Sequence, residues 1–136
     1  MSPYREIEHT ADWSLEVWAP ALEALFVDAA QGMYALAGAR AAPDSGEGER
    51  QTVELQAEDY EALLVGWLQE WLYRTEMLGQ VFEAFQIHRL TPTGLSGSAV
   101  GRPAAHLDKL IKAVTYHNLK ISSTAEGFAA TIVLDV

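Results

Sequence analysis

Two segments of the chain repeat apolar residues with the period of an α-helix, and this feature constrains the fold most. Apolar residues at positions i, i+3, i+4 and i+7 form one face of a helix. The first stripe predicts a helix over residues 20–37, with Pro20 near its start and Gly38 just past its end. The second predicts a helix over residues 58–78, with Gly79 as its stop. Each stripe needs a partner surface that buries it.

Trp67 and Trp71 lie four positions apart in the second stripe, so they share one face of the expected helix. We interpret the pair as core packing. An exposed aromatic platform is the alternative.

The remaining segments carry the alternation and the turn residues that are typical of β-strands. Short turns at 91–94 and 124–127 imply antiparallel pairing of their neighbours. We expect an α+β fold, a two-layer sandwich in which both helices pack on one face of a mostly antiparallel or mixed sheet. Residues 38–50 predict a surface loop. Besides a strand ahead of residue 9, the expected strands are 14–19, 52–57, 81–90, 95–100, 113–122 and 128–136. The strand over 95–100 is expected to be weak, because it is rich in glycine and other small residues.

Composition narrows the class of protein. A length of 136 residues predicts one domain over residues 1–136. The chain carries 19 acidic and 9 basic side chains, a net charge of −10, which argues against direct binding of nucleic acid. It has no cysteine, which excludes disulfides, a thiolate zinc site and a cysteine nucleophile. No apolar run is long enough to span a membrane and residues 1–10 lack the pattern of a secretory signal, so we expect a cytoplasmic protein.

Two acidic positions are candidates for a metal site. Asp12 closes the segment His9-Thr10-Ala11-Asp12, which lies between two expected strands, and Asp135 precedes the terminal carboxylate of Val136. If the last strand ends beside this loop, Asp12 and Asp135 converge. Their oxygens would suit a hard cation such as Ca²⁺ or Mg²⁺ better than zinc. The alternatives are an Asx-turn for Asp12 and a solvated tail for Asp135.

The stretch 111–117 reads as a strand with an unusual lysine. Lys112 is either a guard against pairing at an edge strand or a functional cation, and the pattern favours neither. We interpret His117 as a hydrogen-bonded histidine within a sheet, in preference to a metal ligand. His88 and His106 belong to no motif, so we expect both on the surface.

Taken together, several motifs in order resemble the archease family over nearly the whole chain. They are Glu8-His9-Thr10-Ala11-Asp12, Leu22-Glu23-Ala24-Leu25-Phe26-Val27-Asp28-Ala29-Ala30, Leu63-Leu64-Val65-Gly66-Trp67-Leu68-Gln69-Glu70, Ile111-Lys112-Ala113-Val114-Thr115-Tyr116-His117 and the terminal Leu134-Asp135-Val136. Trp13 departs from the family pattern, in which a small or aliphatic residue is usual. The resemblance implies the same two-layer α+β fold.

The resemblance also implies a function. Archeases are accessory proteins of the RNA-splicing ligase RtcB; they promote its guanylylation and multiple turnover and are not enzymes themselves. They bind a divalent cation, for which calcium is the first expectation, with magnesium and manganese as alternatives. Carried over to this sequence, Asp12, Asp135 and Val136 would hold the metal. Lys112, and with it His9 and His117, are candidates for contact with the partner. We expect a monomer.

Two other functions remain open at this point. A metal-dependent phosphohydrolase would use a hard cation to polarise phosphate and His9 or His117 to move protons. A chaperone-like helper of a tRNA-modifying enzyme would act by binding that enzyme.

Overall fold

The computed structural model describes residues 3–8, 12–43, 46–107 and 111–136, without the side chains of 5–8 and 12. Within these residues the chain forms two helices and nine strands, in the order β1 (Tyr4–Glu8), β2 (Asp12–Ala19), α1 (Leu22–Leu36), β3 (Arg40–Ala41), β4 (Glu49–Gln56), α2 (Tyr60–Leu78), β5 (Gln80–Thr91), β6 (Gly94–His106), β7 (Ala113–Thr115), β8 (Ser122–Thr124) and β9 (Gly127–Asp135).

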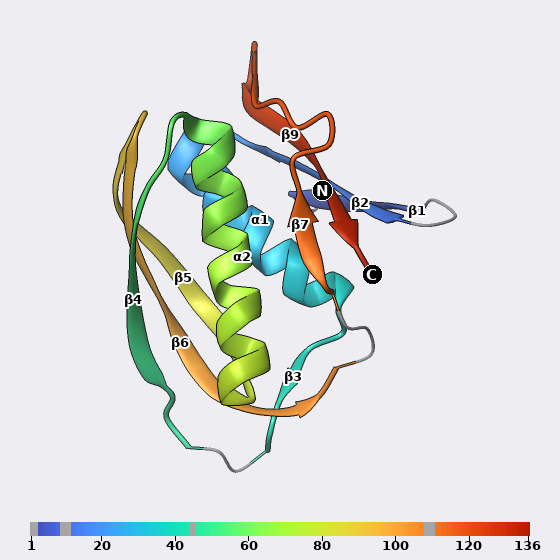
Figure 1. Ribbon diagram of the computed structural model, residues 1–136, viewed down its shortest axis with the longest axis vertical. Coiled ribbons are helices and arrows are strands. Elements are labelled where there is room, and N and C mark those ends of the chain that lie inside the picture. Colours follow the sequence, from blue (N-terminus) through green and yellow to red (C-terminus); the bar gives the residue numbers. More distant parts are fainter. Residues whose placement is uncertain (1–2, 9–11, 44–45, 108–110) are drawn as a thin grey trace.

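The strands form two sheets, and the two helices lie between them (Figure 1). One sheet has the order β1-β2-β9-β7, with β8 also paired to β9. The other has β6 at its centre, between β5 on one side and β3 and β4 on the other. Every pairing is antiparallel. The α+β class, the two helices and the antiparallel pairing expected from the sequence are therefore confirmed.

The number of sheets differs from the expectation of one sheet face under both helices. Helix α1 packs against β2 and β5, and α2 packs against β4, β5 and β7, so each helix contacts both sheets. The reason is the width of the buried surface on α1, where Leu25, Phe26, Ala29, Ala30 and Met33 are all fully buried. A surface that extends so far around a helix needs cover on two sides.

Both helix boundaries follow from local chemistry. The carboxylate of Asp59 accepts a hydrogen bond of 2.8 Å from the backbone N–H of Ala62, which caps the N-terminus of α2. Gly79 ends α2 in the left-handed conformation, with φ of 65°. The helices predicted over 20–37 and 58–78 are confirmed within the fraying expected at helix ends.

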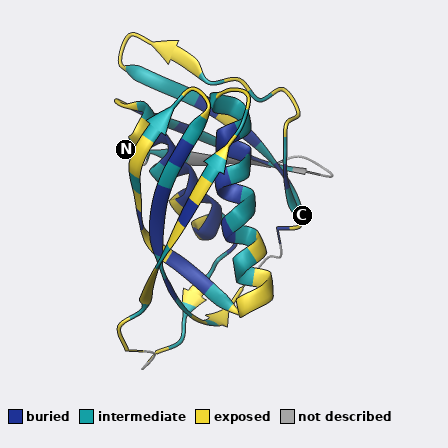
Figure 2. Ribbon diagram, turned by 60° about the vertical axis from the view of Figure 1, so that its left-hand side comes forward, coloured by how far each residue is buried: buried dark blue, intermediate teal, exposed yellow. Residues whose placement is uncertain are grey.

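The tryptophan pair lies in the core, as the sequence predicted. Trp67 and Trp71 are fully buried and meet edge to face, with ring centroids 5.3 Å apart. The indole N–H of Trp67 donates to the backbone oxygen of Phe26 at 3.0 Å, which ties α2 to α1. The buried stripe of the helices is visible between the strands in Figure 2.

The strand expected to be weak is the centre of its sheet. β6 has 13 residues, from Gly94 to His106, and carries pairings on both of its sides. Its small residues serve packing, because a Cβ atom on Gly97 would lie 2.8 Å from the ring of Trp67. The glycine that weakens the sequence pattern is thus what admits the indole against the sheet.

Two other segments differ from the sequence prediction. The strand expected over 113–122 is only Ala113–Thr115, and a turn with Asn118 at φ 52° follows it. The predicted loop over 38–50 includes the short strand β3, which pairs with the end of β6. Turn residues end β7 early. β3 forms through a tertiary pairing that no local sequence pattern indicates.

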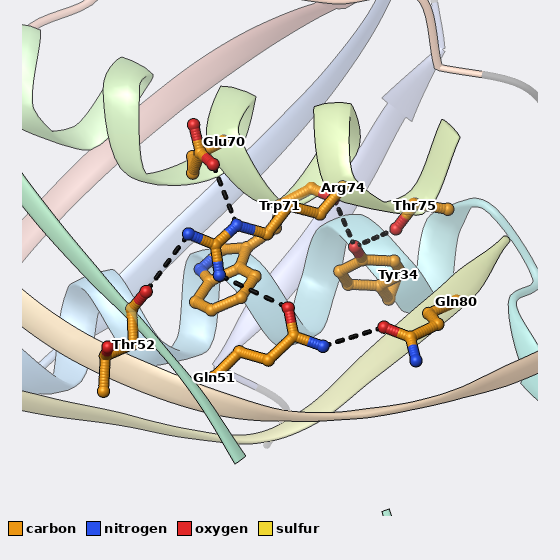
Figure 3. Close-up of polar contacts among 8 residues, drawn as sticks. All are labelled: Tyr34, Gln51, Thr52, Glu70, Trp71, Arg74, Thr75 and Gln80. Atoms are coloured by element: carbon orange, nitrogen blue, oxygen red, sulfur yellow. Dashed lines mark hydrogen bonds and ion pairs between the residues drawn. The ribbon is translucent and has the colours of Figure 1, made fainter. Parts of the chain in front are cut away.

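Arg74 joins α2 to β4 (Figure 3). Its guanidinium bonds to the carboxylate of Glu70 at 2.8 Å and to the backbone oxygen of Thr52 at 3.1 Å. It also donates to the side chain of Gln51 and lies 5.1 Å from the ring centroid of Trp71. A planar cation can make these contacts at once, which fixes the end of the helix over the sheet.

Tyr34 joins the two helices from the other side (Figure 3). Its hydroxyl donates to the backbone oxygen of Trp71 at 3.1 Å and lies 2.5 Å from the hydroxyl of Thr75. Burial raises the pKa of Tyr34 well above its usual value, so the phenol keeps its proton and stays a donor.

Candidate metal centre

Three segments that are far apart in the sequence meet at one end of the β2–β9 ladder. Asp12, the first residue of β2, is paired directly with Asp135, the last residue of β9. On the other side of β9, Asp135 is paired with Ala113 of β7. The Cα atoms of a directly paired antiparallel couple lie about 4.5–5.5 Å apart, and both residues lie on the same face of the sheet. The convergence of Asp12 and Asp135 that the sequence suggested is therefore present in the backbone register.

Asp135 lies on the outer face of its sheet. Ala130, Ile132 and Leu134 alternate with it along β9 and are buried in the core, so Asp135 belongs to the opposite face. Asp135 and Val136 are both partly exposed. The backbone oxygen of Asp135 accepts a hydrogen bond of 2.7 Å from the N–H of Lys112. The end of β9 is thus anchored as part of a sheet, which contradicts a loose, solvated tail.

Lys112 precedes β7 and has an exposed side chain. Among the described strands β7 pairs with β9 alone, so Lys112 lies at the start of an edge strand. The open side of that strand is held by Gln69 of α2, whose side-chain oxygen accepts from the backbone N–H of Val114 at 3.0 Å. Gln69 thus positions β7. The sequence analysis did not indicate this role, because Gln69 lies in a motif that was interpreted only as part of a helix.

His117 is not brought to this end of the ladder by any described contact. His117 lies four residues past Ala113, which corresponds to roughly 13 Å along an extended chain. It is exposed, and its ring nitrogen lies 3.2 Å from the amide nitrogen of the neighbouring Asn118. Its interpretation as a residue within a strand is wrong, because β7 ends at Thr115. His9 lies outside the described residues, as do Thr10 and Ala11.

The histidines read as surface residues are on the surface. His88 is exposed and its ring nitrogen lies 2.9 Å from the hydroxyl of Ser98, while His106 is exposed at the end of β6.

The donor set fits a hard cation in its chemistry. The described part places the carboxylate of Asp135 and an oxygen of Val136 at one sheet end, and the register adds Asp12 opposite Asp135. Oxygen donors of this kind are those that Ca²⁺, Mg²⁺ and Mn²⁺ prefer. Among the described side chains, which do not include that of Asp12, no three His, Cys, Asp or Glu residues form a metal-holding cluster. The fit therefore rests on the backbone register.

Comparison with known proteins decides the family. The model of the archease protein family (MTH1598/TM1083) matches residues 4–136. The chain belongs to the archease family. It is 36% identical to the protein archease of Methanopyrus kandleri, over 98% of this chain and 99% of that one. It is 35% identical to the protein archease of Methanosarcina mazei, over 98% of this chain and 95% of that one.

Comparison with solved structures shows that the chain also shares the fold of the archease family. The solution structure of protein 1598 of Methanobacterium thermoautotrophicum is 26% identical, covers 100% of both chains and has a TM-score of 0.73. The crystal structure of an archease of Thermotoga maritima, described as a possible chaperone, is 22% identical, covers 97% of this chain and 96% of that one, and has a TM-score of 0.68. At that identity the second likeness shows the fold alone. No described helix of this archease is long and apolar enough to cross a membrane.

Proposed function

We propose that this archease is a non-enzymatic, metal-binding activator of the RNA-splicing ligase RtcB. It would promote guanylylation and multiple turnover of the ligase in tRNA splicing and RNA repair. Membership of the archease family supports this proposal. The observation that carries it is the register that pairs Asp12 with Asp135 next to Val136.

In this proposal Asp12, Asp135 and a main-chain or terminal oxygen of Val136 hold a divalent cation, with calcium preferred over magnesium or manganese. A cation bound there would supply a compact positive charge between carboxylates that otherwise repel one another. The backbone hydrogen bond from Lys112 to Asp135 keeps that strand end in place. The exposed ammonium of Lys112 is then a candidate for contact with the ligase, as are His9 and His117.

The surface charge suits such a partner. A protein of net charge −10 is attracted to a ligase that carries a basic surface for RNA, and this attraction speeds encounter more than it adds affinity. The archease thereby acts in RNA metabolism without binding nucleic acid itself. We propose that it acts as a monomer in the cytoplasm. It can shift the ligase toward guanylylation only if it binds one state of the ligase more tightly than another.

The experiment is a guanylylation assay of the RtcB ligase with wild-type archease and with Asp12→Asn and Asp135→Asn variants. Both substitutions keep the shape of the side chain and remove its charge. The matched control is Glu54→Gln, an exposed position of β4 in the other sheet. We expect the two aspartate variants to lose stimulation by about tenfold or more, equivalent to about 1.4 kcal/mol, and the control to keep it. Full stimulation by both aspartate variants would refute the metal-dependent mechanism.

A chaperone-like role for a different RNA enzyme is the second candidate, favoured by the description of the Thermotoga maritima archease as a possible chaperone. Affinity capture from cell extract separates the two. Recovery of the ligase supports the first function, and recovery of a tRNA-modifying enzyme without the ligase supports the second.

A further inference from the structure

A cleft of about 630 Å³ lies at the other end of the β2–β9 ladder from Asp12 and Asp135. The ladder ends there at the pair Ala19 and Phe128, seven residues from Asp12, which corresponds to about 23 Å along a strand. This distance separates the cleft from the candidate metal centre. The volume of the cleft falls in the range of about 300–1,000 Å³ that is typical of ligand sites. The lining residues on which the argument depends are Trp18, Ala19, Asp28, Thr124, Glu126 and Phe128.

Backbone contacts hold the apolar part of the cleft in place. Trp18 and Phe128 are both partly exposed, so their rings are accessible to a ligand. The N–H of Trp18 donates to the backbone oxygen of Pro3 at 3.0 Å, which closes one side. The turn between β8 and β9 closes another, because Gly127 packs so tightly that a Cβ atom there would lie 2.2 Å from the backbone oxygen of Ala19.

The charged residues of the cleft all carry the same sign. Asp28 of α1 and Glu126 of the β8–β9 turn line it, and none of its lining residues is basic. The carboxylate of Asp28 has no hydrogen-bond or ion-pair partner among the described residues, although burial removes part of its water and raises its pKa. A partly dehydrated carboxylate without a partner is stabilised by a cation.

Aromatic faces and carboxylates together select one ligand chemistry. An ammonium or guanidinium group is attracted both to carboxylates and to the faces of Trp and Phe rings. The apolar stem of a lysine or arginine would cover such rings while its charged head reaches the carboxylates. A nucleic acid does not fit, because its phosphates are repelled by Asp28 and Glu126. The exposed rim of Thr124, Ala125 and Glu126 leaves the cleft open to a chain that passes through it.

We propose that this cleft binds a short basic segment of a partner protein, with one lysine or arginine head against Asp28 and Glu126. The apolar parts of the segment would pack against Trp18 and Phe128, which flank the end of the β2–β9 ladder on opposite faces. The volume favours a peptide, because it exceeds what a single cationic side chain fills. This binding does not depend on the metal centre at the other end of the ladder.

The test measures binding of N-acetyl-tetralysine amide by calorimetry, with N-acetyl-tetraglutamine amide as the neutral probe. Because the whole protein is acidic, weak attraction to any polycation is expected, and a variant matched in charge is needed. Asp28→Asn and Glu54→Gln each remove one negative charge, but Glu54 lies on the exposed side of β4, outside the cleft. We expect Asp28→Asn and Trp18→Leu each to weaken tetralysine binding by about fivefold, and Glu54→Gln to leave it nearly unchanged.

Two results would overturn the proposal. Equal weakening by Asp28→Asn and Glu54→Gln would show that the attraction is general and not located in the cleft. Tighter binding of spermidine than of tetralysine, lost in Asp28→Asn, would replace the peptide by a free polyamine. Folding of each variant is verified by its thermal unfolding, so a loss of binding in a folded Asp28→Asn protein supports the proposal directly.

Discussion

The two ends of the β2–β9 ladder are both acidic but differ in what surrounds the carboxylates. At one end Asp12 and Asp135 are paired across the strands, next to Val136. At the other end Asp28 and Glu126 line a cleft with Trp18 and Phe128. Oxygen donors alone favour a small hard cation, whereas carboxylates beside aromatic faces favour an organic one. The same charge thus implies different ligands, and the neighbouring side chains decide between them.

The largest expected effect tests whether the cleft end is held by close packing. Gly127 has φ of 139°, and a Cβ atom would overlap the backbone oxygen of Ala19. We expect Gly127→Ala to lower the free energy of unfolding by about 3 kcal/mol or more, measured by urea denaturation. The control is Gly79→Ala, which has positive φ but nothing within 4 Å of the added atom. It should lose only about 1–2 kcal/mol. Equal losses would show that backbone strain alone matters at Gly127.

The second prediction separates the two ends by ligand. Saturating Ca²⁺ should stabilise the wild type by about 2–3 kcal/mol at a hundredfold excess over its dissociation constant. Asp135→Asn should abolish most of this gain and leave tetralysine binding unchanged. Asp28→Asn should do the reverse. Thermal unfolding with and without Ca²⁺ and calorimetry with the peptide measure both effects, and a single variant that removes both would join the two sites into one.

The third prediction concerns the contact that holds β7 beside the candidate metal centre. Gln69→Leu removes the acceptor for the N–H of Val114 at the open side of β7. We expect a loss of about 1 kcal/mol in unfolding free energy and faster hydrogen exchange at the Val114 amide. Gln69→Glu retains an acceptor oxygen and should protect that amide. If exchange at Val114 is as slow in Gln69→Leu as in the wild type, the helix does not hold this strand.

The smallest effect is a pH dependence at the cleft end. Burial raises the pKa of Asp28 in the folded state, so folding favours the protonated form. Its stabilising contribution is complete below the unfolded-state pKa of about 3.9 and is lost as the pH rises through the higher folded-state value. Asp28→Asn removes the penalty, so it should raise the Tm at pH 7 by up to about 2 °C.

The same comparison at low pH checks the cause of that effect. Well below the unfolded-state pKa of about 3.9, Asp28 is protonated in both states, and the Tm of Asp28→Asn should equal that of the wild type. A gain in Tm that persists at low pH would point to packing instead of charge. Higher stability combined with weaker peptide binding at pH 7 would mark Asp28 as a residue kept for binding.

The sequence by itself determined the elements with a strong local signal. The apolar period gave α1 and α2, the burial of Trp67 and Trp71 followed from that period, and Gly79 marked a helix end. These features depend on residues a few positions apart, whose spacing in a helix is fixed by backbone geometry. The sequence also indicated Asp12, Asp135 and Val136 as candidate metal ligands, and this remains a proposal.

Only the tertiary structure decided how those elements are combined. Whether the helices face one sheet or two depends on which strands pair, and pairing joins residues as distant as Asp12 and Asp135. The role of β6 was hidden because Gly97 lowers strand propensity locally yet makes room for Trp67. The cleft had no signal at all, since Trp18, Asp28 and Glu126 come from three segments that meet only after folding. Local propensity extends over a few residues, whereas these sites are made by contacts between segments that are remote in the chain.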